Sequence, residues 1–250
     1  EENSQYVSFE GISIDNPHVD QNFILEQEKS LPPDIYKQEY LAKFTDAGSD
    51  VFTNVDAVCL ISEYSNGSTP GNRYFAGIDL GLSNDYSVLT IMDGVGRVHY
   101  IERLNGTSYQ EITKAFTDRL NRFKIQGGFV EVNGPGQPVF ETLRSYHKKL
   151  KPFVTTNESK NEGIRSLIYD IQEGTLMLPS KELCPALYNE LNAYTYKVLT
   201  SGKIQFTHPT GLHDDCIMSL MLANQAREKF GNAGGGLYVG GSIPRNQMLR

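Results

Sequence analysis

The sequence has little of what marks secreted or membrane-spanning proteins. It contains only three cysteines, Cys59, Cys184 and Cys216, which are far apart and form no Cys-x-x-Cys pair. Such scattered cysteines favour reduced thiols in a cytoplasmic setting over a disulfide framework or a zinc site. No run of about 18 apolar residues occurs, so nothing in the sequence indicates a membrane-spanning helix. The first residues, from Glu1 to Ser4, lack the basic and apolar regions of a signal peptide, and we expect the chain to begin inside a longer protein.

Positive charge is also scarce. The formal net charge is −7 and the pI is near 5.3. A protein that coats DNA is normally basic, so bulk charge argues against broad nucleic-acid affinity. A metal-dependent nuclease, in contrast, concentrates carboxylates where cations bind. One local basic cluster is either a DNA contact or a solvated helix end, and it comprises Arg144, His147, Lys148, Lys149 and Lys151.

The 250 residues include 39% hydrophobic residues, enough for one large domain or for a medium domain with an extension. Residues 1–70 show no strong strand alternation and predict a linker or the tail of a preceding domain. Residues 65–71 are rich in turn formers and close this segment. We expect residues 71–230 to form the folded domain and the Gly-rich residues 231–250 to form a flexible tail.

Strand and helix patterns between residues 73 and 230 follow a definite order. Three strand-like runs come first, and a tight turn at residues 93–96 joins the second to the third. Ser108 and Glu111 then have the spacing of a capping box that opens a helix. Strands and helices alternate afterwards, with strands expected at 74–80, 86–93, 97–104, 129–132 and 151–155. The order predicts an α/β fold that resembles the ribonuclease-H-like fold: three antiparallel strands, then parallel additions, with helices on both faces.

Asp79 is the first candidate for chemistry, in the strand segment Gly77-Ile78-Asp79-Leu80-Gly81. Alternation puts Asp79 on the same side of the strand as Phe75 and Gly77, while the two glycines leave room for a close approach. A carboxylate in so apolar a run costs on the order of several kcal/mol of desolvation unless a partner such as a cation compensates it. The alternative is a strand-end aspartate that caps the following turn.

Glu131 lies inside the fourth strand-like run, and a Gly-rich loop follows it. If the first and fourth strands are parallel neighbours, Asp79 and Glu131 meet at the carboxyl ends of the strands, where open α/β sheets bind ligands. The alternative is a surface glutamate on an edge strand.

His213, Asp214 and Asp215 open the last apolar helix. One of the two aspartates could cap the helix by accepting backbone N–H bonds. Asp214 shares a helical face with apolar residues and Asp215 falls about 100° round it, so the spacing leaves open which one faces the sheet. His213 could assist a metal or a phosphate, or it could be a hydrogen-bonded structural histidine.

Three carboxylate positions from separate segments suit two divalent cations. Mg²⁺ and Mn²⁺ prefer oxygen ligands, and two such ions about 4 Å apart can activate a water and neutralise a leaving oxygen. Without metal, carboxylates this close would raise one another's pKa, and we expect an empty site to be partly protonated or disordered. Asp85 is either an outer ligand or a turn residue. Lys160 and Arg165 could contact DNA phosphates or lie on a solvated surface, as could Arg144 and Lys148 of the basic cluster.

Taken in order, these motifs resemble the nuclease domain of tailed-phage large terminase subunits. The matching strings are Gly77-Ile78-Asp79-Leu80-Gly81 with Asp85-Tyr86-Ser87, then Val130-Glu131-Val132-Asn133, then His213-Asp214-Asp215 leading into Ile217. Earlier segments are similar to the link between the packaging ATPase and the nuclease, namely Asp15-Asn16-Pro17, Gln38-Glu39-Tyr40 and Phe44. Carried over by position, Asp79, Glu131 and one of Asp214 and Asp215 would be metal ligands.

The resemblance implies an endonuclease that cuts concatemeric double-stranded DNA in the host-cell cytoplasm during viral packaging. It also implies a packaging ATPase domain, a portal protein and a small terminase subunit as partners, and no membrane. The sequence contains no Gly-x-x-x-x-Gly-Lys-[Ser/Thr] phosphate loop, so we expect a nuclease half without its motor.

Three alternatives remain at this point. Gly77–Gly81 also resembles the first phosphate loop of actin-like ATPases and sugar kinases, which need a duplicated fold. A junction resolvase or integrase would share the nuclease fold. A non-catalytic DNA-guiding or portal-docking module would not need a costly set of acids.

Overall fold

The structure, a computed structural model, describes residues 11–43, 51–81, 85–133, 136–200, 203–209 and 211–231. Its centre is a five-stranded sheet in the order β4-β3-β2-β5-β6. The strands are β2 (Tyr74–Asp79), β3 (Ser87–Asp93), β4 (Val98–Leu104), β5 (Gly127–Glu131) and β6 (Leu150–Phe153). The first three are antiparallel, and β5 and β6 extend the sheet in parallel from β2. This is the mixed sheet that the sequence predicts.

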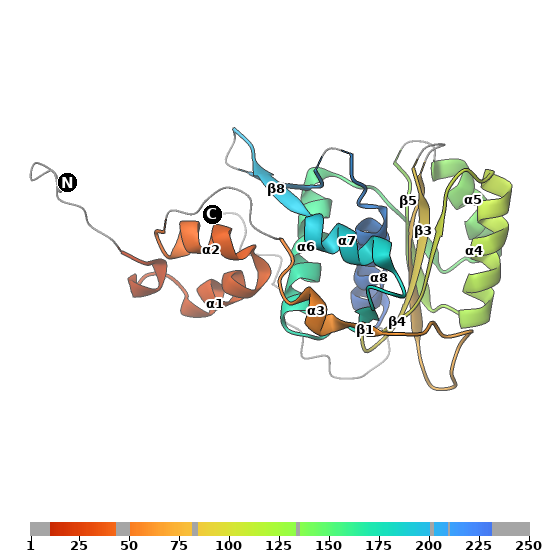
Figure 1. The fold of residues 1–250 in the computed structure, drawn as a ribbon, viewed down its shortest axis with the longest axis horizontal. Coiled ribbons are helices and arrows are strands. Elements are labelled where there is room, and N and C mark those ends of the chain that lie inside the picture. Colours follow the sequence, from red (N-terminus) through yellow and green to blue (C-terminus); the bar gives the residue numbers. More distant parts are fainter. Residues whose placement is uncertain are drawn as a thin grey trace, which may run out of the picture.

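Helices cover both faces of the sheet (Figure 1). On one face lie α4 (Tyr109–Phe123) and α5 (Gly136–Tyr146), and on the other α6 (Asn157–Gln172), α7 (Pro185–Ala193) and α8 (Asp215–Gly231). The predicted capping box is confirmed at the start of α4, where Ser108 and Glu111 bond each other's backbone N–H. Apolar side chains of the sheet are divided between the two layers: Phe75 packs toward α8, whereas Ala76 and Ile78 pack toward α4 and α5.

The packing of α8 on β2 is close because Gly77 has no side chain. A Cβ atom at Gly77 would overlap the carbonyl oxygen of Ser219 and the backbone nitrogen of Ala223. In return, the Ser219 hydroxyl donates to the Gly77 carbonyl at 2.9 Å and lies 2.9 Å from the Thr90 hydroxyl. The close approach expected at Gly77 is therefore made by a helix backbone. It fixes α8 relative to the strand that ends in Asp79.

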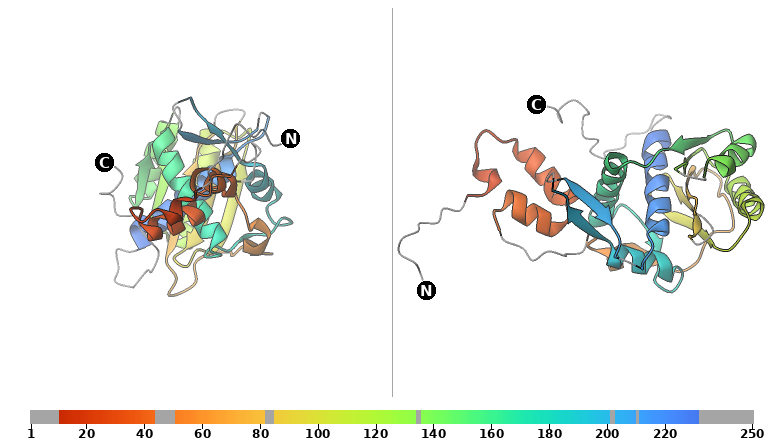
Figure 2. Two further views of the ribbon diagram at one scale, coloured as in Figure 1. Left: turned by 90° about the vertical axis from the view of Figure 1, so that its left-hand side faces the viewer. Right: turned by 90° about the horizontal axis from the view of Figure 1, so that it is seen from above.

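The residues before the sheet divide into two parts. A 3₁₀ turn (Ser13–Asp15), α1 (Gln21–Ser30) and α2 (Pro33–Tyr40) form a small apolar cluster beside α6 and the hairpin of β8 (Thr195–Val198) and β9 (Ile204–Thr207) (Figures 1 and 2). In contrast, α3 (Val55–Val58) and β1 (Cys59–Ile61) belong to the main core, where β1 pairs in parallel with β7 (Leu178–Pro179). The folded domain thus begins before residue 71, because residues 51–61 supply part of its core.

Some sequence expectations fall outside the described residues. These are the tail from residue 232 and Phe44. Among the residues that the structure does describe, no helix is both long and apolar enough to cross a membrane.

Candidate metal centre

Asp79 and Glu131 lie side by side at the carboxyl edge of two parallel strands. Asp79 is the last residue of β2, and the register of β2 with β5 pairs Ile78 with Val130, one residue before each acid. A hydrogen bond joins the two carboxyl groups. Glu131 is not on an edge strand, because β5 lies between β2 and β6. The predicted meeting of these acids at one edge of the sheet is confirmed.

The surroundings of Asp79 disfavour its charge. The residue is only 9% exposed. Burial raises its pKa well above the ordinary value, and the hydrogen bond and charge of Glu131 and the charges of Asp215 and Asp214 raise it further. None of the hydrogen bonds found among the described residues brings a backbone N–H to its carboxylate. The raised pKa of Asp79 therefore favours its protonated form, and a bound cation would favour the charged form instead.

The start of α8 brings in two further acids with different partners. One carboxylate oxygen of Asp214 is 2.8 Å from the Lys160 ammonium and accepts a hydrogen bond from the Tyr194 hydroxyl at 3.3 Å. Asp215 has a buried carboxylate oxygen with no hydrogen-bond partner among the described residues. Burial raises the pKa of Asp215, and the charge of Asp214 adds to this while His213 opposes it. Asp214 is thus paired with a lysine at hydrogen-bond distance, whereas Asp215 keeps one oxygen without a hydrogen bond among the described residues.

Neither aspartate caps α8 with its side chain in the described structure. The first-turn N–H groups of Cys216 and Ile217 instead donate to one carboxylate oxygen of Glu190, at 2.9 and 3.1 Å. Glu190 belongs to α7, and burial raises its pKa to about 7. The role of Glu190 is not apparent from the sequence, because a cap from another helix has no local sequence signal.

A shell of basic and aromatic groups surrounds Asp215. The Arg103 guanidinium on β4 stacks on the Tyr86 ring at 3.3 Å from its centroid and lies 3.8 Å from Glu190. His213 Nδ1 lies 3.7 Å from Asp215 and 3.8 Å from the exposed Asp85. His213 therefore lies beside Asp215, and Asp85 lies beyond His213.

The carboxylates at this edge of the sheet are ligands suited to hard divalent cations, although they are not yet arranged as a complete coordination shell. Asp79, Glu131 and Asp215 offer carboxylate oxygens, which Mg²⁺ and Mn²⁺ prefer. The unpartnered oxygen of Asp215 and the carboxyl–carboxyl hydrogen bond of Asp79 and Glu131 are the groups a cation would satisfy. Within the described ranges, no three His, Cys, Asp or Glu side chains already form a metal-binding group. Binding would thus require side-chain rotation at this edge.

The predicted DNA-contacting residues are dispersed. Lys160, at the start of α6, lies at the acidic site through its ion pair with Asp214. Arg165 is half-buried, and burial lowers its pKa overall although the charge of nearby Tyr40 opposes this. Arg144 and Lys148 are exposed near the end of α5 and before β6, at the opposite end of the parallel strands. Of these four, only Lys160 is brought to the carboxylates.

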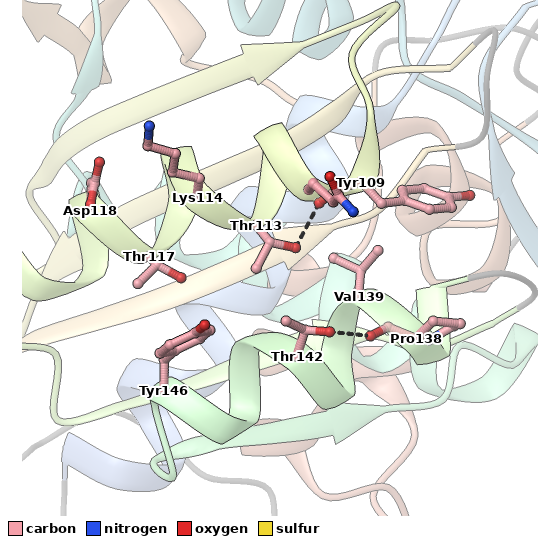
Figure 3. A pocket seen from close by; sticks show the side chains of 10 residues that line it. Tyr109, Thr113, Lys114, Thr117, Asp118, Pro138, Val139, Thr142 and Tyr146 are labelled. Carbon is pink, nitrogen blue, oxygen red and sulfur yellow. Dashed lines mark hydrogen bonds between the residues drawn. The ribbon is translucent and has the colours of Figure 1, made fainter.

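A separate groove lies between α4 and α5, on the other side of the sheet (Figure 3). Its volume is about 470 Å³, and its lining includes Tyr109 and Tyr146. The hydroxyls of Thr113 and Thr142 point into their own helices, donating to carbonyls at 2.7 and 2.9 Å. No group in this lining belongs to the acidic site, so the groove does not form part of the metal centre.

The family model described as the terminase RNaseH-like domain matches residues 76–226. The large terminase subunit of Thermus phage G20c is 25% identical over 231 residues, covering 87% of this chain and 46% of that protein. The chain therefore spans about half the length of the curated relatives it matches.

Two solved structures show the same fold. The large terminase nuclease of thermophilic phage G20c with bound magnesium has a TM-score of 0.62 at 23% identity, covering 72% of this chain and 98% of that one. A large terminase from another thermophilic bacteriophage, in complex with ATP-gamma-S, has a TM-score of 0.55 at 15% identity, covering 84% and 53%. With a family model matched over more than half of its length, and the acids of all three motifs at one edge of the sheet, the chain belongs to the terminase RNaseH-like domain family.

Proposed function

We propose that this chain is a metal-dependent DNA endonuclease, the nuclease part of a phage large terminase subunit. The observation that carries the proposal is the buried Asp79 carboxyl, which is paired with Glu131 and feels the charge of Asp215, together with the Asp215 oxygen that has no hydrogen-bond partner among the described residues. Buried acids without cationic partners are costly to a fold, and a phosphodiester-cleaving metal site gives them a use. The magnesium-bound G20c relative supports the same class of activity.

Asp79, Glu131 and Asp215 would hold the cations, and Asp214 would join them if it left Lys160. Two bound Mg²⁺ or Mn²⁺ ions would supply an activated water and would neutralise the leaving oxygen of the cleaved phosphodiester. Two features of the protein orient these acids. Helix α8 is fixed on β2 at Gly77, and Glu190 accepts hydrogen bonds from the N–H groups in the first turn of α8. Asp85 and His213 flank Asp215, where either could contact a metal-bound water.

DNA binding would begin at Lys160, whose ammonium already lies beside the carboxylates. An ammonium there offsets the repulsion between the acids and a backbone phosphate. Contacts by Arg165, Arg144 and Lys148 remain predictions for more distant parts of the duplex.

We also propose a substrate, a location and partners for this nuclease. The substrate would be concatemeric double-stranded DNA in the host-cell cytoplasm. The partners would be a packaging ATPase domain, a portal protein and a small terminase subunit. The length of the curated relatives and the ATP-gamma-S complex of the second structural relative support an ATPase companion.

The direct test is cleavage of a supercoiled plasmid by this chain with Mg²⁺ or Mn²⁺. Cleavage that needs the cation and is lost in Asp79→Asn supports the proposal, provided that the variant is folded and does not melt below the original chain. A matched control is Asp118→Asn, an exposed aspartate on α4 across the sheet, which should cut like the original chain. Equal cutting by Asp79→Asn would remove the basis of the assignment.

A further inference from the structure

The start of α8 has an unusual arrangement of acids. Asp214 precedes the helix, its carbonyl accepts the Met218 N–H at 2.8 Å, and Asp215 is the first helical residue. Aspartate at this place normally folds its carboxylate back onto the free N–H groups of the first turn. Here those N–H groups, on Cys216 and Ile217, are already bonded to Glu190 from α7.

We propose that Glu190 is a positioning residue for metal binding: by capping α8 from α7, it occupies the N–H groups that Asp214 or Asp215 would otherwise cap, so that Asp214 stays with Lys160 and the Asp215 carboxylate stays available near Asp79. The inference rests on the proposed function, since it concerns how the same acids are presented to a cation. The hydrogen bonds of Glu190 go to the N–H groups of Cys216 and Ile217, so it acts on the two aspartates through the backbone of α8.

The placement of Glu190 is itself supported. Its second carboxylate oxygen is buried without a hydrogen-bond partner among the described residues and lies 3.8 Å from the Arg103 guanidinium, which is stacked on Tyr86. Glu190 is 9% exposed and α7 packs against α8, so little room exists for the side chain to turn elsewhere. The Tyr86 ring in turn meets His213 edge-on, with ring centroids 5.6 Å apart. Arg103 and Tyr86 thus connect the cap to the residue that precedes the two aspartates.

The side chain at position 190 must be long enough to accept hydrogen bonds from the N–H groups of Cys216 and Ile217. Glu190→Gln keeps an oxygen that can accept from both N–H groups. Glu190→Asp keeps the charge but is one methylene too short, and Glu190→Ala removes the acceptor. With the acceptor gone, Asp214 or Asp215 is free to cap α8, which keeps the helix folded but withdraws a carboxylate from the site.

The experiment measures Mn²⁺ affinity by titration calorimetry, together with melting of the metal-free protein. Changing the outer partner of a metal ligand costs about 10–100-fold in affinity, so we expect that loss for Glu190→Ala and Glu190→Asp. Glu190→Gln should stay within about threefold of the original chain. Glu182→Ala, an exposed glutamate just before α7, is the matched control and should bind normally.

The outcomes separate the two proposals. If the original chain binds no Mn²⁺, the proposed function fails. If it binds Mn²⁺ and Glu190→Asp binds equally well, the positioning role is wrong. If Glu190→Ala does not fold, Glu190→Asp carries the test. A crystal structure of a weak-binding variant should show an Asp214 or Asp215 carboxylate on the N–H of Cys216 or Ile217, and unchanged aspartates there would also contradict the inference.

Discussion

Two buried aspartates end neighbouring strands of the same sheet and have opposite environments. Asp93 ends β3, where its carboxylate accepts the backbone N–H groups of Val95 and Arg97 at 3.1 and 3.0 Å and contacts His99 Nε2 at 2.9 Å. Burial would raise the pKa of Asp93, but the hydrogen bonds from His99, Arg97 and Val95 lower it overall. Asp79 ends β2 at the other end of the sheet, with another acid as its neighbour and a raised pKa.

The difference shows what a structural strand-end aspartate looks like in this fold. Asp93 stabilises a tight turn, and the Ser65 hydroxyl, 2.8 Å from His99 Nδ1, connects it to the preceding loop. Asp79 has no such partners among the described residues. The Asp93 carboxylate thus has hydrogen-bond donors that stabilise its charge, whereas the neighbour of Asp79 is another acid that disfavours it.

Among the substitutions that test the contrast between Asp79 and Asp93, we expect the largest effect on DNA cleavage. Asp79→Asn should reduce metal-dependent plasmid cutting by more than about 100-fold, because it changes a ligand rather than an outer partner. The same variant should melt at a higher temperature than the original chain when metal is absent, since it removes a buried acid. A variant that cuts normally, or that is less stable without metal, would contradict the role given to Asp79.

The next effect concerns the packing that aligns Asp79 with Asp215. Gly77→Ala would force α8 away from β2, and we expect the free energy of unfolding to fall by about 3 kcal/mol. Urea denaturation measures this loss. Gly11→Ala is the control, because a Cβ at Gly11 meets nothing within 4 Å. If Gly77→Ala were as stable as the original chain, the close packing of α8 on β2 would not contribute to stability.

Asp93 should behave in the opposite way to Asp79. Asp93→Ala leaves His99 and two turn N–H groups without their acceptor, so the free energy of unfolding should fall by about 2–3 kcal/mol. Mn²⁺ affinity should be unchanged, because the site lies at the other end of the sheet. Calorimetry and urea denaturation on the same sample test both statements, and a loss of Mn²⁺ binding would break the distinction between the two aspartates.

The smallest effect is the pH dependence of stability without metal. The folded chain holds protons on Asp79, Asp215 and Glu190 at pH values where the unfolded chain has lost them. Stability therefore falls as pH rises from about 4 toward the raised values, which for Glu190 is about 7. Melting curves across this range should show a decline that Asp79→Asn reduces. A rise in stability over the same range would contradict the pKa directions.

Much of the fold and part of the site could be predicted from the sequence. Period-two patterns and the capping box at Ser108 have local causes, so the sheet order and α4 were accessible. Asp79 and Glu131 were identified because acids in apolar strands conflict with their surroundings. The three-residue β1 was missed because so short a strand has no pattern of its own, and its partner β7 is over 100 positions away.

The finer features of the site depend on contacts between distant segments. Spacing alone could not show that the two aspartates have different partners, because Lys160, which pairs with Asp214, lies 54 positions earlier in the chain. The cap from Glu190 is likewise set by how α7 packs on α8. Local sequence determines which acids are near the edge, and tertiary packing decides which of them are free.

The most direct test is a crystal of this chain soaked in MnCl₂ and measured at a wavelength where manganese scatters anomalously. We predict manganese at the carboxyl edge of β2 and β5, bonded to carboxylate oxygens of Asp79, Glu131 and Asp215. Well-ordered carboxylates at this edge with no manganese beside them, or manganese held elsewhere without Asp79, would contradict this prediction.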